Sequence, residues 1–172
     1  MYRLILVAGI FIATAVRAEV TPDLGEELTA QQISATGFTV WPDGEGLPEG
    51  SGNAATGENL YQAHCFACHG RNGENGINDR LAGGHGTIDS PKPVKTVGSY
   101  WPHATTLFDY IRSAMPYQRP GTLSDDEVYS LTAYILHLNG IVARDTEINA
   151  TSLPQIQMPN RDNFVWATQQ TN

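Results

Sequence analysis

The sequence predicts an all-α fold with loop-rich N- and C-terminal extensions, and three observations support this prediction. Apolar side chains recur at helical spacing in three segments, residues 56–70, 105–114 and 124–139. Each segment carries residues typical of helix starts or stops. Glycine, proline and asparagine gather in the stretches between and outside these segments, which indicates turns and loops. In a chain of 172 residues, this pattern predicts one helical domain between two less regular flanks.

The first helix is expected to begin at Thr56, whose side chain suits an N-cap, and to end at Gly70. Glu58 lies where the helix dipole favours a negative charge. Leu60, Tyr61 and His64 follow at helical spacing, so this helix is expected to run directly into the motif described next.

Residues 65–69 read C-x-x-C-H, the pattern for covalent attachment of a c-type haem. Thiols three residues apart lie on nearly the same face of a helical turn, so both can add to the vinyl groups along one edge of a porphyrin. The imidazole of His69 then lies where it can bind the iron. The sequence therefore predicts one haem c, attached to Cys65 and Cys68 and ligated by His69.

Three alternatives compete with haem attachment. Only two cysteines are present, which excludes a zinc site of four cysteines, and a site built from His64, His69 and both thiols could hardly close a tetrahedron within six residues. A thioredoxin-like redox pair would follow a strand rather than a helix. A structural disulfide is the third alternative. The export signal described below favours haem.

The second helix follows a long loop. Residues 71–86 are rich in glycine and asparagine, which suits backbone that passes close to a flat cofactor. Pro102 is expected in the first helical turn, with Trp101 near the cap. Leu107, Phe108 and Ile111 then form the apolar face, and Met115-Pro116 ends the helix.

The third helix has the clearest limits. Ser124 and Glu127 form a predicted capping box, with acidic residues in the first turn. Apolar side chains form a stripe along the helix, and Asn139-Gly140 ends it. The stripe consists of Val128, Leu131, Tyr134, Ile135 and Leu138.

Residues 1–18 are predicted to be a secretory signal peptide. An apolar run from Leu4 to Val16 follows Arg3, and small residues at Val16 and Ala18 suit cleavage after Ala18. An uncleaved N-terminal anchor is the alternative. No second apolar stretch approaches membrane length. We therefore expect a periplasmic protein without a membrane span after cleavage.

The predicted organisation after the signal peptide is an N-terminal arm at 19–52, a haem-binding domain at 53–140 and a C-terminal wrapping tail at 141–172. A short helix is expected from Thr29, with Gln32 completing a weak capping box. Phe38, Val40 and Trp41 are large apolar residues within the arm, so they are expected to be buried, on this chain or on a partner.

The formal charge of the chain is −8. Cleavage after Ala18 would remove Arg3 and Arg17 and leave eight basic against 18 acidic residues, a charge of −10. Such a chain will not bind nucleic acid through a basic face. The acidic surface is either a docking surface for a basic partner or a generally solvated surface.

The sixth ligand of the iron comes from a short set of candidates. Met115 follows the second helix on a loop that could reach the face opposite His69, and a soft thioether raises the potential. Met158, beyond the last helix, is the second candidate. A histidine ligand or an open site remains possible, with His64, His85, His103 and His137 as the other histidines, which are more often loop, cap or solvated helix residues.

The order of helix, C-x-x-C-H, glycine-rich loop, helix, methionine and capped last helix resembles a class I cytochrome c over residues 53–140. In that family a glycine and an aromatic residue of the first helix cross the last helix closely. Gly57 and Tyr61 match, facing Leu131 and Tyr134. Family members often have a proline carbonyl that accepts from the proximal imidazole. Leu81 here is not preceded by proline, so the accepting carbonyl stays open.

A more specific resemblance is to the cytochrome subunits of periplasmic molybdenum sulfur dehydrogenases, namely the Sox sulfane dehydrogenase cytochrome and the sulfite dehydrogenase cytochrome. It rests on LAGG, KTVGSYWP, ATTLFDYI, AMP and LTAYIL at 81–84, 95–102, 104–111, 114–116 and 131–136. Flanking matches are PDG, GLP and MPNRD at 42–44, 46–48 and 158–162. The Sox subunit usually has a second haem domain, whereas this chain has one C-x-x-C-H.

This resemblance implies a function. A separate molybdenum-containing subunit would oxidise sulfite or a sulfane sulfur, and this chain would accept single electrons and pass them to a soluble cytochrome c. The chain would be an electron-transfer subunit rather than a catalyst on its own. Tyr100, Trp101 and Arg112 are expected to pack on the haem or to hydrogen-bond its propionates, although Trp101 could equally be a core aromatic residue. The alternatives are a free electron shuttle without a permanent partner and an enzyme with an open haem site, such as a peroxidase.

Overall fold

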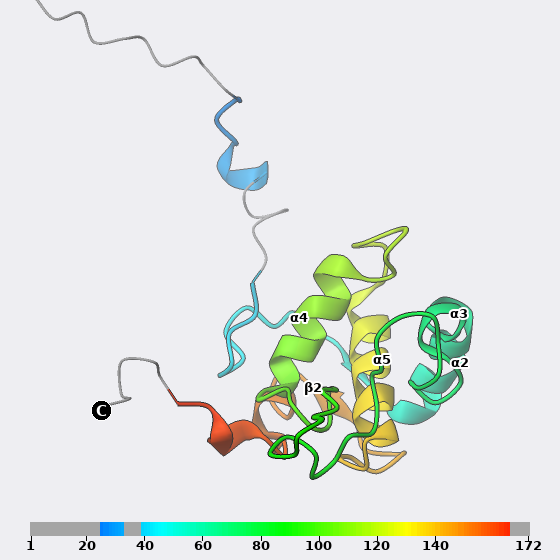
Figure 1. Cartoon of the computed structure of the whole chain (residues 1–172). Coiled ribbons are helices and arrows are strands. Elements are labelled where there is room, and N and C mark those ends of the chain that lie inside the picture. The colour runs from blue at the N-terminus through cyan, green and yellow to red at the C-terminus, as the bar shows by residue number, and fades with distance from the viewer. Residues whose placement is uncertain (1–24, 33–38, 166–172) are drawn as a thin grey trace, which may run out of the picture.

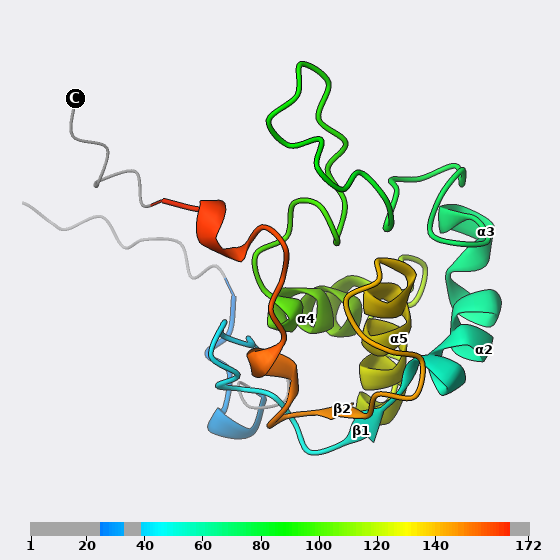
Figure 2. The same cartoon turned by 90° about the horizontal axis from the view of Figure 1, so that it is seen from below.

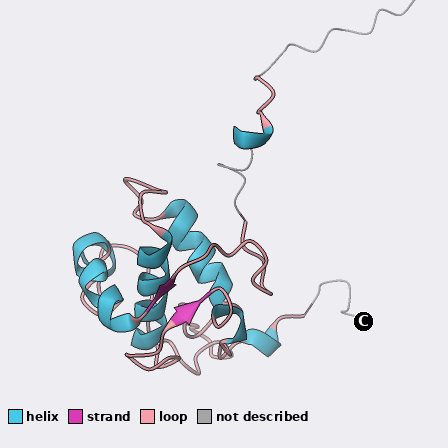
Figure 3. Cartoon of the chain, turned by 180° about the vertical axis from the view of Figure 1, so that it is seen from behind, coloured by secondary structure: helices cyan, strands magenta, loops and turns pink. Residues whose placement is uncertain are grey.

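The computed structural model describes residues 25–32 and 39–165, and the fold is helical (Figures 1 and 3). Its helices are α2 (Ala54–His64), α3 (Phe66–His69), α4 (Ala104–Ala114) and α5 (Asp125–Leu138). Two short strands, β1 (Ser51–Gly52) and β2 (Ile148–Asn149), form an antiparallel pair. Two 3₁₀ turns, η1 (Leu153–Gln155) and η2 (Arg161–Asn163), follow in the C-terminal region. The predicted all-α fold class is confirmed, and the small sheet is an addition to it.

Helix α5 is the centre of the molecule, packed against α2 on one side and α4 on another (Figure 1). Nine consecutive residues of α5, from Val128 to Leu136, are buried, so the predicted apolar stripe is only part of its buried surface. The capping box is confirmed, because the Ser124 hydroxyl accepts from the Glu127 N–H and the Glu127 carboxylate accepts from the Ser124 N–H. Asn139 is the C-cap residue, as predicted.

The crossing of α2 and α5 matches the expected close approach. A Cβ added at Gly57 would collide with the backbone of Ser130, so only glycine fits at this point of the crossing. The rings of Tyr61 and Tyr134 pack with their centroids 5.2 Å apart. The residue opposite Gly57 is thus Ser130 rather than the expected Leu131, while the expected Tyr134 contact is confirmed.

The predicted limits of two helices need correction. Asn53, not Thr56, caps α2, and its side chain accepts from the Thr56 N–H. A break at Cys65 separates α2 from α3, where the sequence predicted one continuous helix. Pro102 precedes the N-cap of α4, His103, and therefore lies outside the first helical turn. Gly70 and Met115 end α3 and α4 as expected.

Both flanks contribute to the folded body. The β1–β2 pair joins residues before α2 to residues after α5, with Ser51 opposite Asn149. Val40, Ile148, Leu153 and Met158 are buried in the same core as α4 and α5. Figure 2 shows β1 and β2 on one side of α5 and the long loop between α3 and α4 on the opposite side.

The expectation for the arm is confirmed in part. Thr29 and Gln32 exchange the hydrogen bonds of a capping box. Val40 is buried, and its N–H donates to Asp109 on α4. Trp41 is 58% exposed, so this chain does not bury it, and burial against a partner stays a prediction. Phe38 and the predicted signal peptide at 1–18 lie outside the described residues. No helix in the described ranges has the length and apolar character of a membrane span.

Candidate haem site

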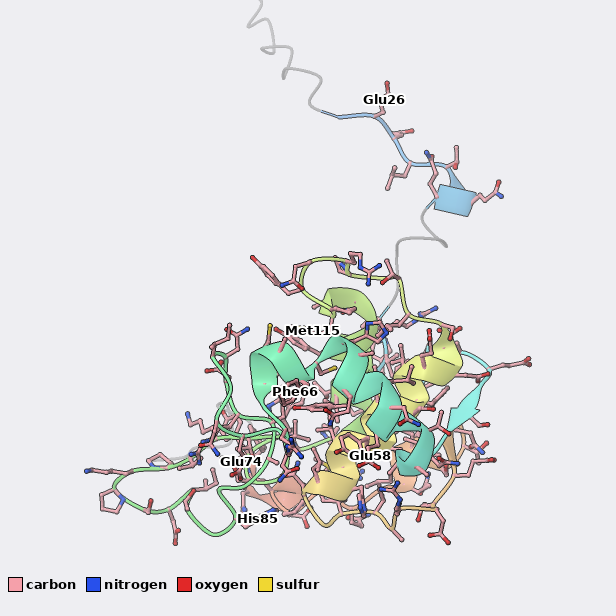
Figure 4. All side chains as sticks on the ribbon, turned by 90° about the vertical axis from the view of Figure 1, so that its right-hand side faces the viewer. Glu26, Glu58, Phe66, Glu74, His85 and Met115 are labelled. Carbon is pink, nitrogen blue, oxygen red and sulfur yellow. The ribbon has the colours of Figure 1, made fainter. Side chains whose placement is uncertain are left out.

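A cavity of about 790 Å³ lies between α3, the long loop and α4, within the size range of ligand and cofactor pockets. Its wall includes Cys65, Cys68 and His69 from the C-x-x-C-H motif, and Met115 from the end of α4. Apolar side chains supply much of the remaining wall: Leu81, Val97, Trp101, Leu107, Ile111, Leu131 and Ile135. Figure 4, which has α2 and α3 nearest the viewer, marks Met115 at the end of α4 and Phe66 on α3.

Local hydrogen bonds set the direction of the motif. The Cys65 N–H continues the α2 pattern by donating to the Tyr61 carbonyl, and the Cys65 carbonyl then accepts from the N–H groups of Cys68 and His69. The two cysteines are not joined by a disulfide, and both are partly buried. Burial, with a smaller contribution from Cys68, raises the pKa of the Cys65 thiol to about 11. The two thiols and the imidazole of His69 therefore line the same wall of the cavity, as the spacing predicts.

The carbonyl that accepts from His69 is that of Asp79, 2.8 Å from Nδ1. This contact assigns the proton to Nδ1 and leaves Nε2 as the free donor atom toward a metal. Backbone hydrogen bonds hold the chain before and after Asp79. The Asn78 N–H donates to the Cys68 carbonyl, and the Leu81 N–H donates to the Gly73 carbonyl. The sequence could not identify Asp79, since any carbonyl of the loop could have been brought to the ring.

Two glycines allow the loop to fold back on the motif. Gly70 has a φ of +77°, and a Cβ there would collide with the Glu74 carbonyl. A Cβ at Gly76 would collide with the Cys68 carbonyl. The glycine-rich loop was expected to pass close to the cofactor. In the structure, its glycines let it pass close to the backbone of the C-x-x-C-H motif.

The candidates for the sixth ligand differ in whether they line the cavity. Met115 is half-buried and lines the cavity together with His69, whereas Met158 is 3% exposed within the hydrophobic core and does not line it. Of the other histidines, only His64 lines the cavity. The Nδ1 of His137 lies 3.1 Å from the Val142 carbonyl. His103 precedes α4, and burial, with a smaller contribution from Arg161, lowers its pKa. These positions favour Met115 as the second axial ligand.

Of the three residues expected around the haem propionates, one lines the cavity and two do not. Trp101 lines the cavity and meets Tyr110 edge to face, with centroids 5.9 Å apart. Tyr100 does not line it, because its ring turns toward Phe164, 5.4 Å away. Arg112 does not line it either, because its Nε pairs with Asp125 of α5 at 2.9 Å. The helical and loop pattern gave no direction for these side chains. The expected contacts of Tyr100, Trp101 and Arg112 with the haem therefore stay a prediction.

Two cationic side chains that sequence reasoning missed do line the cavity, Arg80 and Lys95. Lys95 also lies over the Tyr100 ring, 4.8 Å from its centroid. The sequence offered one indication of this position, because both residues lie in the loop between the C-x-x-C-H motif and α4. The cavity offers a partner for each part of haem c. Two thiols suit its covalent attachment, and an imidazole and a thioether suit the iron. Apolar walls suit the ring, and two cations suit the carboxylates. In the described ranges no group of three or more His, Cys, Asp or Glu side chains is arranged to hold a metal ion.

Comparison with known proteins agrees with this site. Residues 52–135 match the family model described as cytochrome C oxidase, cbb3-type, subunit III. A chain in the crystal structure of the sulfane dehydrogenase SoxCD from Paracoccus pantotrophus is 41% identical, with a TM-score of 0.77 over 84% of this chain and 71% of that one. The matched share extends beyond the α2–α5 region into the flanks.

Two thiosulfate dehydrogenases are also similar. That of Psychrobacter arcticus is 31% identical over 101 residues, 53% of this chain, and that of Allochromatium vinosum is 30% identical over 108 residues, 54% of this chain. The chain spans about a third of the length of each, 31% and 36%. With the fold, the motif and these matches together, the chain belongs to the class I cytochrome c family as an electron-transfer protein with one covalently bound haem c, related to cytochromes of sulfur-oxidising enzymes.

Proposed function

We propose that this cytochrome is the electron-accepting subunit of a periplasmic molybdenum dehydrogenase that oxidises sulfite or a sulfane sulfur. The observation that carries the proposal is the 41% identity to a chain of the sulfane dehydrogenase SoxCD over 84% of this chain. A minimal haem domain would not need the flanks that this similarity includes. The electrons would pass on to a soluble cytochrome c, and the substrate would be held by the partner.

The residues of the cavity have distinct roles in this proposal. Haem c, attached through Cys65 and Cys68, supplies a one-electron iron couple when bound. The Asp79 carbonyl fixes the ring of His69, which would hold the iron through Nε2. Met115 would supply its thioether as the second ligand, and this pairing of ligands would raise the reduction potential of the haem. The apolar side chains of the wall would limit the access of water to the iron.

Exposed apolar side chains at the rim of the cavity support docking of a partner. Ile77 is 85% exposed and Tyr117 is 79% exposed, and both also line the cavity. Large apolar groups that are open to water beside a cofactor site are typical of a protein contact surface. A partner that covers them would bring its own redox centre close to the haem.

One observation favours the second candidate, a free electron shuttle. Ile148, Leu153 and Met158 of the C-terminal flank are buried in the chain's own core. The flank therefore does not need a partner to cover its apolar residues. Under this alternative, the rim around Ile77 would make only short-lived contacts.

Purification from the native source separates the two candidates. A tagged full-length chain, exported and processed by its host, would be isolated and assayed for bound molybdenum and for haem reduction on addition of sulfite or thiosulfate. We expect a molybdenum protein to co-elute and the haem to be reduced by the substrate. A lone monomer that neither substrate reduces would contradict the subunit proposal and leave the shuttle.

A matched pair of variants tests the docking surface. Ile77→Ser removes an exposed apolar side chain at the rim, whereas Val165→Ser removes one that is 65% exposed and does not line the cavity. We expect slower haem reduction by the partner only with Ile77→Ser. Equal rates in both variants would exclude this rim as the contact surface.

A further inference from the structure

Asn139, the C-cap residue of α5, has a buried side chain with all its polar atoms engaged. It is 6% exposed. Its Nδ2 donates to the Leu81 carbonyl at 3.0 Å and to the Ile135 carbonyl at 2.9 Å, and its Oδ1 accepts from the Gly83 N–H at 3.2 Å. One amide therefore joins the end of α5 to two points of a loop more than 50 residues away in the sequence.

This loop is the one that carries the hydrogen-bond partner of His69. Asp79, whose carbonyl lies 2.8 Å from His69 Nδ1, comes two residues before Leu81. On its other side, the loop is tied by the Thr96 hydroxyl, which donates to the Gly83 carbonyl at 2.6 Å. The bonds of Asn139 thus fix the position of the segment just after Asp79 relative to the most buried helix.

The structure also leaves no room for the amide to move toward Gly98. A Cβ at Gly98 would collide with the Asn139 oxygen. The amide is therefore held by three hydrogen bonds and by close backbone on a further side. Burying an amide is favourable only when its bonds are made, so the complete set makes this arrangement rigid.

Asn160 provides a comparison within the same molecule. It is 5% exposed, and its Nδ2 donates to the Tyr100 carbonyl at 2.8 Å. The type of bond is the same, but Tyr100 does not line the cavity and is not part of the Asp79 segment. Loss of either amide removes a buried hydrogen bond. Only loss of the Asn139 amide would release the loop beside His69.

We propose that Asn139 is a positioning residue for the proximal iron ligand: it holds the 79–83 loop so that the Asp79 carbonyl keeps its hydrogen bond to His69. This inference rests on the proposed role of His69 as an axial ligand. Asn139 itself does not line the cavity and acts only through the loop.

The test is solvent exchange of the His69 Nδ1 proton in the complete haem protein, followed by NMR. Asn139→Ala is compared with Asn160→Ala at conditions of equal global stability. We expect exchange to be at least about tenfold faster in Asn139→Ala, because loss of even one of its two hydrogen bonds to the loop allows a factor of that size. Asn160→Ala should exchange like the wild type.

Gly98→Ala provides a second route, because the added methyl group displaces the amide without removing it. If Asn139→Ala does not yield haem protein, Asn139→Asp, which keeps the acceptor for Gly83 and loses both donations, is measured in its place. Equal exchange in the Asn139 and Asn160 variants would overturn the proposal. In the oxidised wild-type protein, whose Fe(III) is paramagnetic, a His69 signal without a hyperfine shift would instead refute His69 as a ligand, which is a separate failure.

Discussion

The two faces of α5 differ in how they are held. On the α2 side, backbone meets backbone at Gly57 and Ser130, and the Tyr61 and Tyr134 rings pack directly. On the loop side, α5 borders a cavity of about 790 Å³, and the loop is joined to α5 by the side chain of Asn139, while the Thr96 hydroxyl also bonds its backbone. Protein atoms of α2 therefore fill the space beside the first face, whereas the haem would fill the space beside the second.

The largest effect is expected at the helix crossing. Gly57→Val would place branched carbon atoms where even one Cβ collides with the Ser130 backbone. Because backbone cannot yield as a flexible side chain does, we expect a loss of about 3 kcal/mol or more in the free energy of unfolding. Urea denaturation of the oxidised haem protein measures it.

Gly121→Ala is the control, since nothing lies within 4 Å of the added Cβ and its φ of +72° gives the only strain. That strain should cost about 1 kcal/mol. If Gly57→Val were no more harmful than Gly121→Ala, the close crossing of α2 and α5 would not be the contact that holds this face.

On the loop side, Met115→Ala should change the haem rather than the fold. Loss of the thioether should lower the midpoint potential by on the order of 0.1 V, a part of the roughly 0.8 V range that axial ligation spans. The iron should then bind added cyanide or CO. Potentiometry and ligand titration check this, with Met158→Leu as the control, because Met158 is buried away from the cavity.

Thr96→Val tests how the loop is held. Thr96 is 2% exposed, and its hydroxyl donates to the Gly83 carbonyl. Valine keeps the shape but takes this partner from the Gly83 carbonyl and from the Ser99 N–H, which donates to the hydroxyl. We therefore expect a loss of about 1–2 kcal/mol. Thermal unfolding measures the loss, and hydrogen exchange should show faster opening of the loop than of α2. Uniform exchange across both regions would contradict a loop with its own local stability.

The smallest effect is expected at the start of α5. Ser124→Ala removes the N-cap and should cost about 1 kcal/mol at neutral pH. Hydrogen bonds from the Ser124 N–H and then its hydroxyl lower the pKa of Glu127. That contribution is present above the unfolded value of about 4.3 and is lost as pH falls through the lower folded value. The difference between wild type and Ser124→Ala should therefore shrink toward pH 3, as urea titrations can show.

The difference between the two faces also explains what sequence reasoning could reach. Helical period, the capping box at Ser124 and the C-x-x-C-H spacing are local patterns. They correctly predicted where α2, α4 and α5 lie in the sequence and that the motif lines the cavity, but not the break between α2 and α3. Asn53 replaced Thr56 as the cap of α2, since both residues are good caps and only the chain's entry direction decides between them.

Positions set by distant contacts were out of reach. Nothing local selects the Asp79 carbonyl for His69, turns Tyr100 toward Phe164 or pairs Arg112 with Asp125. The β1–β2 pair likewise depends on residues nearly 100 positions apart in the sequence, with strands of two residues each. Such short strands carry no alternating pattern from which they could be predicted.

The visible spectrum of the oxidised protein tests the central claim, that His69 and Met115 face one haem across this cavity. We predict a thioether-to-iron charge-transfer band in the wild type and in Met158→Leu, and no such band in Met115→Ala. A band that persists in Met115→Ala, or is missing from the wild type, would contradict the proposed ligation and the electron-transfer role built on it.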